Sequence, residues 1–352
     1  MTMTDDSPAL FHFKGIIDST LREGLQFSKA NFALAQQKRI LDYLDKIGLN
    51  YVEVGNPVQP QTRQTISALL RHRRTPSFKV LAHIRNHPDD TARAIDCGVA
   101  GVNILCTVDA ERLAAMDLSP EAYRERLSGN VELAKSRGLE VRVGVEDFFG
   151  RPPEAGLDLY QAAVACGADR LSVADTLGKT MAWEVFRRLR GLRRRFVTDI
   201  EAHFHNDLGH AVSNAIVALR AGANWISTSL LGLGERTGIT PLSSFLANLC
   251  LLDGRAASRY NLRWLTLAES YVARICGIDM PPHLMTNRAN GFAHKAGLHL
   301  DALVKFGPHK YECLDPRTIG NKRSLIVGTT VSGKTTPAQV RAFEKRFGGD
   351  PA

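Results

Sequence analysis

The feature that most constrains the fold is a series of eight short, mainly apolar runs between residues 15 and 232. Runs of this kind are typical of strands buried on both faces, as in a parallel sheet. Helix-like segments separate them, and in residues 34–47 the apolar side chains fall on one face before the stop at Gly48. The runs are GIID (15–18), YVEVG (51–55), FKVLAHI (78–84), GVNILC (101–106), EVRVGVED (140–147), RLSVADT (170–176), IEAHFHND (200–207) and WISTSLLG (225–232).

Eight strand–helix units over about 250 residues predict an α/β fold, a (β/α)8 TIM barrel. An open doubly wound sheet is the alternative, but no GxGxxG motif follows the first run, which favours the closed barrel. The pattern then changes to loops and short helices. We therefore expect a catalytic barrel at residues 12–275 and a smaller α-rich subdomain at residues 276–352, serving as a lid or in dimerisation.

The net charge of +9 bears on the class of partner. Basic residues cluster in RHRR (71–74) and FRRLRGLRRR (186–195). Nucleic-acid binding and attraction of an anionic substrate are two interpretations. Apolar residues recur among the arginines, however, so solvated helix faces are the preferred interpretation, and we expect no nucleic-acid partner.

Membrane and disulfide classes are disfavoured by the sequence. No apolar run reaches the roughly 18 residues that a membrane span requires. The six cysteines are scattered and form no CxxC pair, so we expect neither a zinc knuckle nor a disulfide framework. Reduced thiols in the cytoplasm fit this usage best.

Polar side chains gather where the apolar runs end. In a TIM barrel the active site lies at the C-terminal ends of the strands, so these residues would meet at one mouth. Convergence from most of the ring is hard to explain as solvated surface. The residues concerned are Asp18, Arg22, Glu23, Gln26, His83, Arg142, Glu146, Asp175, Thr176, His203 and His205.

The motif HFHND places His203 and His205 two residues apart on a strand, so that their side chains point the same way. Two imidazoles on one face, with a carboxylate from Glu23 and another from Asp18, would form a site for a divalent metal with open positions. The alternative is a pair of ordinary hydrogen-bonded barrel histidines. Barrel geometry together with Glu23 favours the metal.

Arg22 and Arg142 are fixed cations at the same mouth. Each suits a substrate that carries carboxylates, and each could instead pair with a carboxylate of the barrel. His83 could bind or polarise the substrate, or could merely cap its strand.

The sequence GTTVSGKT (328–335) formally matches the phosphate-binding P-loop pattern. Too little chain follows it for the parallel sheet and second acidic strand of a nucleotidase, so we interpret it as a chance match.

Four motifs together carry a resemblance to a known family. The chain resembles the metal-dependent acyl-CoA Claisen-condensing barrels, the homocitrate synthase and isopropylmalate synthase family, and within it homocitrate synthase. The resemblance extends over about residues 14–334. The motifs are IIDSTLREGLQF, HFHNDLGHAVSNA, LLGLGERTGITPL and HKAGLHLDAL.

The resemblance implies condensation of acetyl-CoA with a 2-oxo acid, in a homodimer that uses a divalent metal, Mn²⁺, Mg²⁺, Co²⁺ or Zn²⁺. Arg22 would steady the developing alkoxide. Glu146 with His294, which lies in the C-terminal region, would remove the acetyl proton. The implied metal ligands are Glu23, His203 and His205, and the implied substrate-binding residues are Arg22, Gln26, His83, Arg142 and Thr176.

Departures from the homocitrate pattern leave the acceptor acid open. Leu25 replaces an acid, Asn103 stands where an Asp is usual, and Gly144 replaces the Ser of an Arg-x-Ser motif. The tyrosine expected after HKAGLHLDAL is counted as absent. Retention of Arg142 and Thr176 indicates a distal anion, either 2-oxoglutarate or, alternatively, phosphonopyruvate or phosphinopyruvate in antibiotic biosynthesis.

Two other protein classes share some of these features. A lyase of the same superfamily would share the barrel and the two histidines, but HKAGLH resembles the synthases. A metal-binding barrel without catalysis would rest on the departures, yet Arg22, Glu23, His203 and His205 are all present.

Overall fold

The computed structural model describes residues 11–72, 77–326 and 336–347. The chain divides into two compact units between Arg259 and Tyr260. The predicted boundary at residue 275 stays a prediction, because compactness and function need not divide a chain at the same residue. The GTTVSGKT segment lies outside the described residues.

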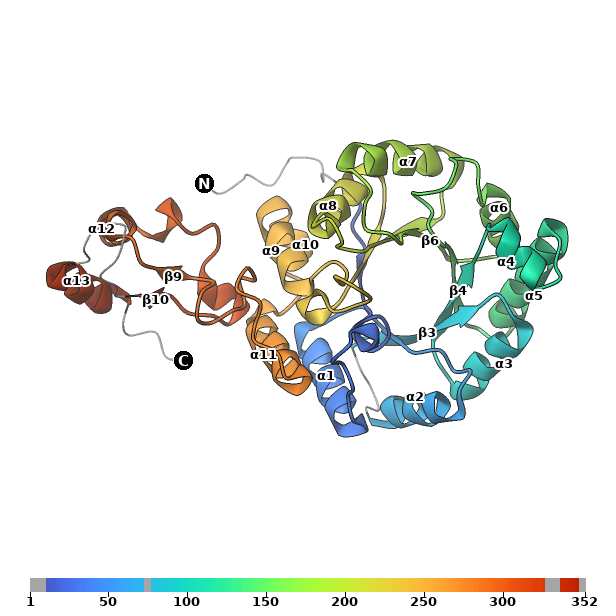
Figure 1. Ribbon diagram of the computed structural model, residues 1–352, viewed down its shortest axis with the longest axis horizontal. Helices are drawn as coiled ribbons and strands as arrows, with labels where there is room; N and C mark the ends of the chain where they lie inside the picture. The colour runs from blue at the N-terminus through green and yellow to red at the C-terminus, as the bar shows by residue number, and fades with distance from the viewer. Residues whose placement is uncertain (1–10, 73–76, 327–335, 348–352) are drawn as a thin grey trace. The chain divides into compact units, whose positions relative to one another are not determined.

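The first unit is a closed barrel of eight parallel strands, which confirms the predicted fold class (Figure 1). The ring closes where β1 pairs with β8, with Gly15 opposite Trp225 and Asp18 opposite Thr228. The strands are β1 (Gly15–Asp18), β2 (Tyr51–Val54), β3 (Lys79–Arg85), β4 (Gly101–Cys106), β5 (Glu140–Val145), β6 (Arg170–Asp175), β7 (Asp199–Phe204) and β8 (Trp225–Thr228).

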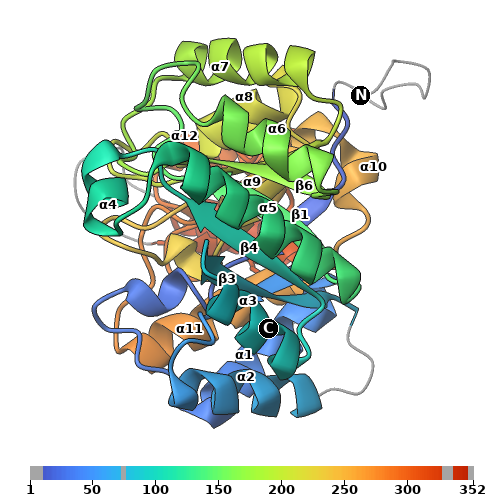
Figure 2. The same cartoon turned by 90° about the vertical axis from the view of Figure 1, so that its right-hand side faces the viewer.

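Helices surround the strands, and Figure 2 shows α5 lying outside β4. Local sequence sets their ends: Ser119 caps α5 by accepting from the Ala122 N–H, and α1 stops at Gly48 in the left-handed region, φ 85°. The helices are α1 (Leu34–Ile47), α2 (Pro60–His72), α3 (Pro88–Cys97), α4 (Ala110–Ala115), α5 (Pro120–Ser136), α6 (Leu157–Ala165), α7 (Ala182–Arg195), α8 (Ala211–Ala221), α9 (Leu242–Leu252) and α10 (Gly254–Ala257).

Alternation along the strands separates an apolar layer from a polar interior. On β7, Ile200, Ala202 and Phe204 are fully buried, whereas Glu201 and His203 line a cavity inside the barrel. Strands β5 and β6 follow the same rule. The apolar side chains pack against the helices, and the polar side chains face the interior of the barrel.

The second unit is a mainly helical region, as expected. Leu300 and Leu303 of α12 pack against Phe343 of α13, and β9 pairs with β10 in parallel. Its elements are η3 (Leu262–Trp264), α11 (Leu265–Cys276), β9 (Ala293–His294), α12 (Gly297–Phe306), η4 (Pro308–Lys310), η5 (Pro316–Ile319), β10 (Ser324–Leu325) and α13 (Pro337–Phe347).

Among the residues described in the two units, no helix combines the length and the apolarity that crossing a membrane would require.

Candidate functional site: a polar cavity in the barrel

A cavity of about 710 Å³ opens inside the barrel, lined by inward-facing residues of the strands and by residues of the loops that follow their C-terminal ends. Barrel enzymes place their active sites at this end. Eight residues singled out from the sequence line this cavity: Arg22, Glu23, Gln26, His83, Glu146, Thr176, His203 and His205.

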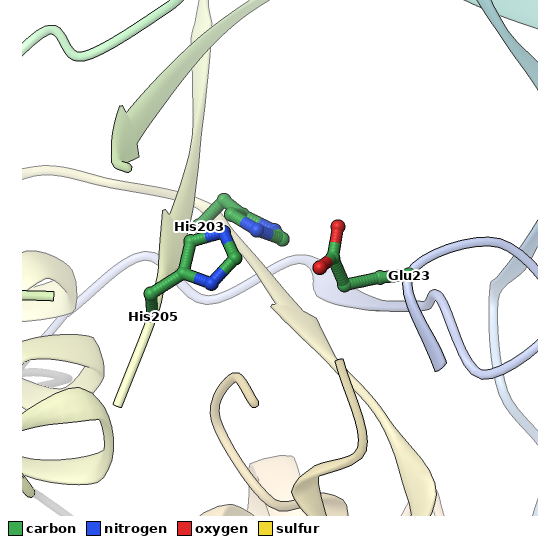
Figure 3. Close-up of side chains that lie close together, drawn as sticks. All are labelled: Glu23, His203 and His205. Carbon is green, nitrogen blue, oxygen red and sulfur yellow. The ribbon is translucent and has the colours of Figure 1, made fainter. Parts of the chain in front are cut away.

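Glu23, His203 and His205 form a compact cluster of possible metal ligands (Figure 3). One ligand atom from each residue lies within 4.8 Å of the others, and all three residues are buried. The histidines project from the end of β7, and Glu23 comes from the loop after β1, with its carboxylate facing the rings. The strand period of two thus produces the shared face expected from HFHND.

A line of hydroxyls sets the tautomer of His203. Ser19 donates its only hydroxyl proton to Glu53 Oε2, at 3.0 Å. In the hydrogen bond between the hydroxyls of Ser19 and Ser227, whose oxygens are 3.3 Å apart, Ser227 must therefore be the donor. Ser227 then accepts from His203 Nδ1, at 3.0 Å. The proton therefore lies on Nδ1, and Nε2 keeps a free lone pair, which is what a metal ligand requires.

Burial keeps both imidazoles neutral. Burial and, after it, the neighbouring His205 lower the pKa of His203 to about 3, and burial likewise lowers the pKa of His205. His205 Nδ1 is buried without a hydrogen-bond partner among the described residues. Neutral imidazoles with free lone pairs fit a divalent ion.

Glu23 is held as a carboxylate. Burial alone would raise its pKa, but the charge of Arg22 and the nearby histidines outweigh burial, and the pKa is lowered. Its Oε1 accepts from the Glu235 N–H at 2.9 Å, and Arg22 forms an ion pair with its other oxygen. Because a Cβ at Gly234 would lie 3.0 Å from Glu23 Cγ, a larger residue at this position of the GLGERTG loop would press on the Glu23 side chain.

Arg22 bridges Glu23 and a second carboxylate, Glu53, to which its Nε donates at 2.7 Å. Burial would lower the pKa of Arg22, but the charges of the two carboxylates outweigh it and raise the pKa. Its side chain is 16% exposed and lines the cavity, so one edge of the guanidinium can meet a ligand.

Arg142 takes the other role that the sequence allows, that of a counter-ion inside the barrel. It is 2% exposed, its Nη1 donates to Glu201 at 2.7 Å, and its Nη2 forms an ion pair with Glu53. The cavity lining includes Gly144, two residues further along β5, but not Arg142. Direct contact of Arg142 with a substrate therefore stays a prediction, without support from its position.

Glu53 and Glu201 line the cavity too, and the sequence analysis did not identify them. Glu201 accepts from Arg142 and, at 3.2 Å, from Arg170, so three buried carboxylates and three guanidiniums form one connected network. Each is a single acid within an apolar run, YVEVG and IEAHF. An acid at that position in a buried strand was the available signal, because such a group must have a partner.

The free energy of unfolding at acid pH should depend on the protonation of Glu53. Burial would raise its pKa, but Arg22 and Arg142 hold it well below the usual 4.5. Below about pH 4.5 the unfolded chain therefore binds more protons than the folded protein, and the free energy of unfolding should fall as the pH falls. Urea unfolding of E53Q should show a shallower pH slope there than wild type, and the control E125Q, at an exposed position of α5, should not. Parallel wild-type and E53Q slopes would contradict this.

Gln26, His83 and Thr176 are held by neighbours at the cavity wall. Turned so that it donates, the Gln26 amide bonds Glu23 Oε1 at 2.9 Å. His83 Nδ1 lies 3.1 Å from Asn103 Nδ2 and 3.6 Å from Glu53 Oε1. Thr176 Oγ1 accepts from the Asp147 N–H at 2.9 Å, so its hydroxyl holds the backbone as well as facing the cavity.

The loops around the metal ligands are fixed by the rest of HFHND. Asn206 Oδ1 accepts from the Ala211 N–H at the start of α8, and Asp207 receives two bonds from Arg236, at 2.8 and 2.7 Å. Arg236 also donates to the Thr176 carbonyl at 2.7 Å. Asp18, considered as a further metal ligand, instead accepts the Thr20 N–H at 2.9 Å.

The expected proton-transfer pair is divided between the two units. Glu146 lines the cavity and forms an ion pair with Arg112. His294 lies on β9 of the second unit, where its Nε2 is 3.1 Å from Glu312 Oε1 and Arg323 in turn donates to Glu312. The pairing of Glu146 with His294 stays a prediction.

A tyrosine does follow the HKAGLHLDAL segment, contrary to the expectation that it is missing. Tyr311 lies eight residues beyond Leu303, and its ring stacks on His299 at 3.8 Å between centroids. The intervening η4 turn separates it from the motif in sequence. The sequence alone does not predict that the Tyr311 ring stacks on a histidine of this motif.

Comparison with known proteins adds the family. Residues 14–272 match the HMGL-like family, and residues 287–345 match the homocitrate synthase post-HMGL domain-like family. The mitochondrial homocitrate synthase of Schizosaccharomyces pombe is 37% identical over 90% of this chain and 76% of that protein. The cytosolic isozyme of Saccharomyces cerevisiae is 35% identical over 90% of this chain and 74% of that protein.

A solved structure gives the fold independently. The HMG-CoA lyase of Bacillus subtilis superposes with a TM-score of 0.68 at 22% identity, covering 77% of this chain and 96% of that one. Identity this low shows the fold alone, so the match does not support lyase activity for this chain. The curated relatives do not favour phosphonopyruvate or phosphinopyruvate as the acceptor. The chain belongs to the HMGL-like family of barrel enzymes, with the homocitrate synthases among its relatives.

Proposed function

We propose that this enzyme is an acyltransferase that condenses acetyl-CoA with a 2-oxo acid, of which 2-oxoglutarate is the preferred one. The observation that carries the proposal is the cluster of Glu23, His203 and His205 beside Arg22 in the cavity. The homocitrate synthases among its relatives support the same reaction class.

Glu23, His203 and His205 would hold a divalent ion, Mn²⁺, Mg²⁺, Co²⁺ or Zn²⁺. When bound, such an ion supplies Lewis-acid polarisation of a ketone. One carboxylate with two neutral imidazoles suits this role, because the set leaves positions open for oxygen atoms of a substrate.

The chain's own groups account for the proton and charge movements. A base, Glu146 with His294, takes a proton from the acetyl methyl group, and the resulting carbanion forms a carbon–carbon bond with the keto carbon of the acceptor. The keto oxygen gains the electron pair, and Arg22 stabilises that negative charge before the oxygen is protonated. Water then cleaves the thioester, which releases CoA.

The balance of charges in the cavity favours a dianionic acceptor. The carboxylates of Glu23, Glu53 and Glu201 are matched one for one by three guanidiniums, so the network itself is neutral. A divalent cation added to it leaves two positive charges, which a dicarboxylate neutralises and a monocarboxylate does not. His83, Gln26 and Thr176 would contact this acceptor from the wall.

Thiol release from acetyl-CoA tests the function. The purified protein with Mn²⁺ or Mg²⁺ should release CoA fastest with 2-oxoglutarate, more slowly with oxaloacetate and least with 2-oxoisovalerate, because only the first two are dianions. A chelator should abolish release, and added metal should restore it. Release that a chelator leaves unchanged, or none with any acid, would contradict the proposal.

The oligomeric state and the cellular location are further parts of the proposed function. We place the enzyme in the cytoplasm as a homodimer, on the strength of the resemblance and of six cysteines without partners in the chain. Light scattering on a sizing column should give twice the 38.7 kDa chain mass.

A further inference from the structure

The cavity wall has a gap beside Gly144. A Cβ at this position on β5 would lie 3.4 Å from Asn103 Oδ1 and 3.5 Å from Ser172 Cβ, which are ordinary or nearly ordinary contact distances. The wall therefore has room for a small side chain that the sequence does not supply. Gly144, Asn103 and Ser172 all line the cavity, so atoms of a ligand can enter this space.

Ser172 presents a hydroxyl to the gap from the neighbouring strand. In the barrel register it lies opposite Gly144 on one side and Glu201 on the other, at the same level of the interior. The residue is 6% exposed, and no other described residue bonds its hydroxyl. Tyr160 donates to the Ser172 carbonyl at 2.6 Å and so fixes the backbone that carries it.

Asn103 faces the gap from the other side. It is 6% exposed, its Nδ2 lies 3.1 Å from His83 Nδ1, and its Oδ1 has no hydrogen-bond partner within the described chain. If the amide is turned, Oδ1 accepts from His83 Nδ1–H and Nδ2 faces the gap instead. Either orientation leaves a buried polar atom aimed at the gap, and such an atom is costly unless a ligand satisfies it.

We propose that Ser172 determines the preference for the acceptor acid, by supplying from β6 the hydroxyl that Gly144 lacks on β5. Its O–H and, with the amide turned, the Nδ2–H of Asn103 together donate to the distal carboxylate of the acceptor. This inference rests on the proposed function. Arg142, two residues before Gly144, contributes charge from beneath, since Glu53 and Glu201 already occupy its Nη atoms.

Substitution of the hydroxyl separates binding from chemistry. S172A should raise the KM for 2-oxoglutarate about tenfold or more and leave kcat nearly unchanged, because it removes one hydrogen bond to a charged group far from the reacting carbon. Calorimetric titration of the metal-loaded protein with 2-oxoglutarate, without acetyl-CoA, should show the same loss of affinity. Thermal melting checks the fold, and S213A on the surface of α8 is the matched control.

Transposing the hydroxyl gives the sharper test. S172G should weaken 2-oxoglutarate as S172A does, and G144S in the S172G background should recover most of the affinity, since the two Cβ positions are 3.5 Å apart and face one space. Unchanged KM and Kd in S172A and S172G, or failure of G144S to recover any affinity, would overturn the role of Ser172. Because calorimetry reports binding without turnover, the inference is tested even if the wild type releases no CoA, a result that would instead refute the proposed reaction.

Discussion

The variant H203A is expected to lose its bound divalent metal and to release CoA about a thousandfold more slowly than wild type. Lewis-acid polarisation is worth several kcal/mol of transition-state stabilisation, and each 1.36 kcal/mol is tenfold in rate. Elemental analysis after dialysis should give stoichiometric metal in the wild type and little in H203A. E23Q should behave similarly, because it replaces the only charged member of the cluster.

Two controls distinguish ligation from general damage. S227A leaves the cluster intact but removes the acceptor of His203 Nδ1, so metal affinity or rate should fall by about 10- to 100-fold, less than in H203A. H72A, which alters a pair with Asp42 on α1, should keep both metal and activity. Metal retained in full by H203A would show that the cluster is not the site.

Replacement of Arg142 by leucine should be the most destabilising single change in the barrel interior. It leaves Glu53 and Glu201 buried, both 3% exposed or less, without the guanidinium they share. Breaking a buried ion pair by removing one partner typically costs about 3–5 kcal/mol of unfolding free energy. Urea unfolding followed by tryptophan fluorescence suits the measurement, since Trp225 lies against Arg170 at the same network.

The acid dependence of this loss identifies its cause. At lower pH the Glu53 carboxylate, which has lost Arg142, can take up a proton, so the difference between R142L and wild type should shrink. The matched control is R187L, which removes an exposed pair with Glu184 on α7 and should cost under about 1 kcal/mol. R142L that unfolds at the same urea concentration as wild type would mean that the network contributes nothing to stability.

The barrel and its metal ligands could be predicted because both follow from local periodicity. Each apolar run indicates a strand that is buried against a helix. The strand period of two places His203 and His205 on the same face, and this depends only on local sequence. The strand ends are less regular: residues 225–232 were expected to be one run, but β8 stops at Thr228. Leu231 then adopts φ 60°, which starts the turn that brings the loop back to Glu23.

The ionic network could not be predicted, because its partners come from different strands. Glu53, Arg142 and Glu201 are far apart in sequence, and their meeting depends on how the eight strands stagger when the barrel closes. No short window of sequence contains that stagger. The role of Arg142 was therefore open between substrate and counter-ion, and only the closed ring shows which groups occupy it.

Glu53 has a consequence for how this enzyme can evolve. One carboxylate receives Arg22, Arg142 and Ser19, and through the hydroxyls it reaches His203, so a mutation at any of these positions disturbs several others and needs compensation. Gly144 and Ser172 form no side-chain bond with that network in the described chain. Substitutions at the positions bonded to Glu53 should therefore be strongly coupled to one another, whereas substitutions at Gly144 or Ser172 should leave that network of bonds intact.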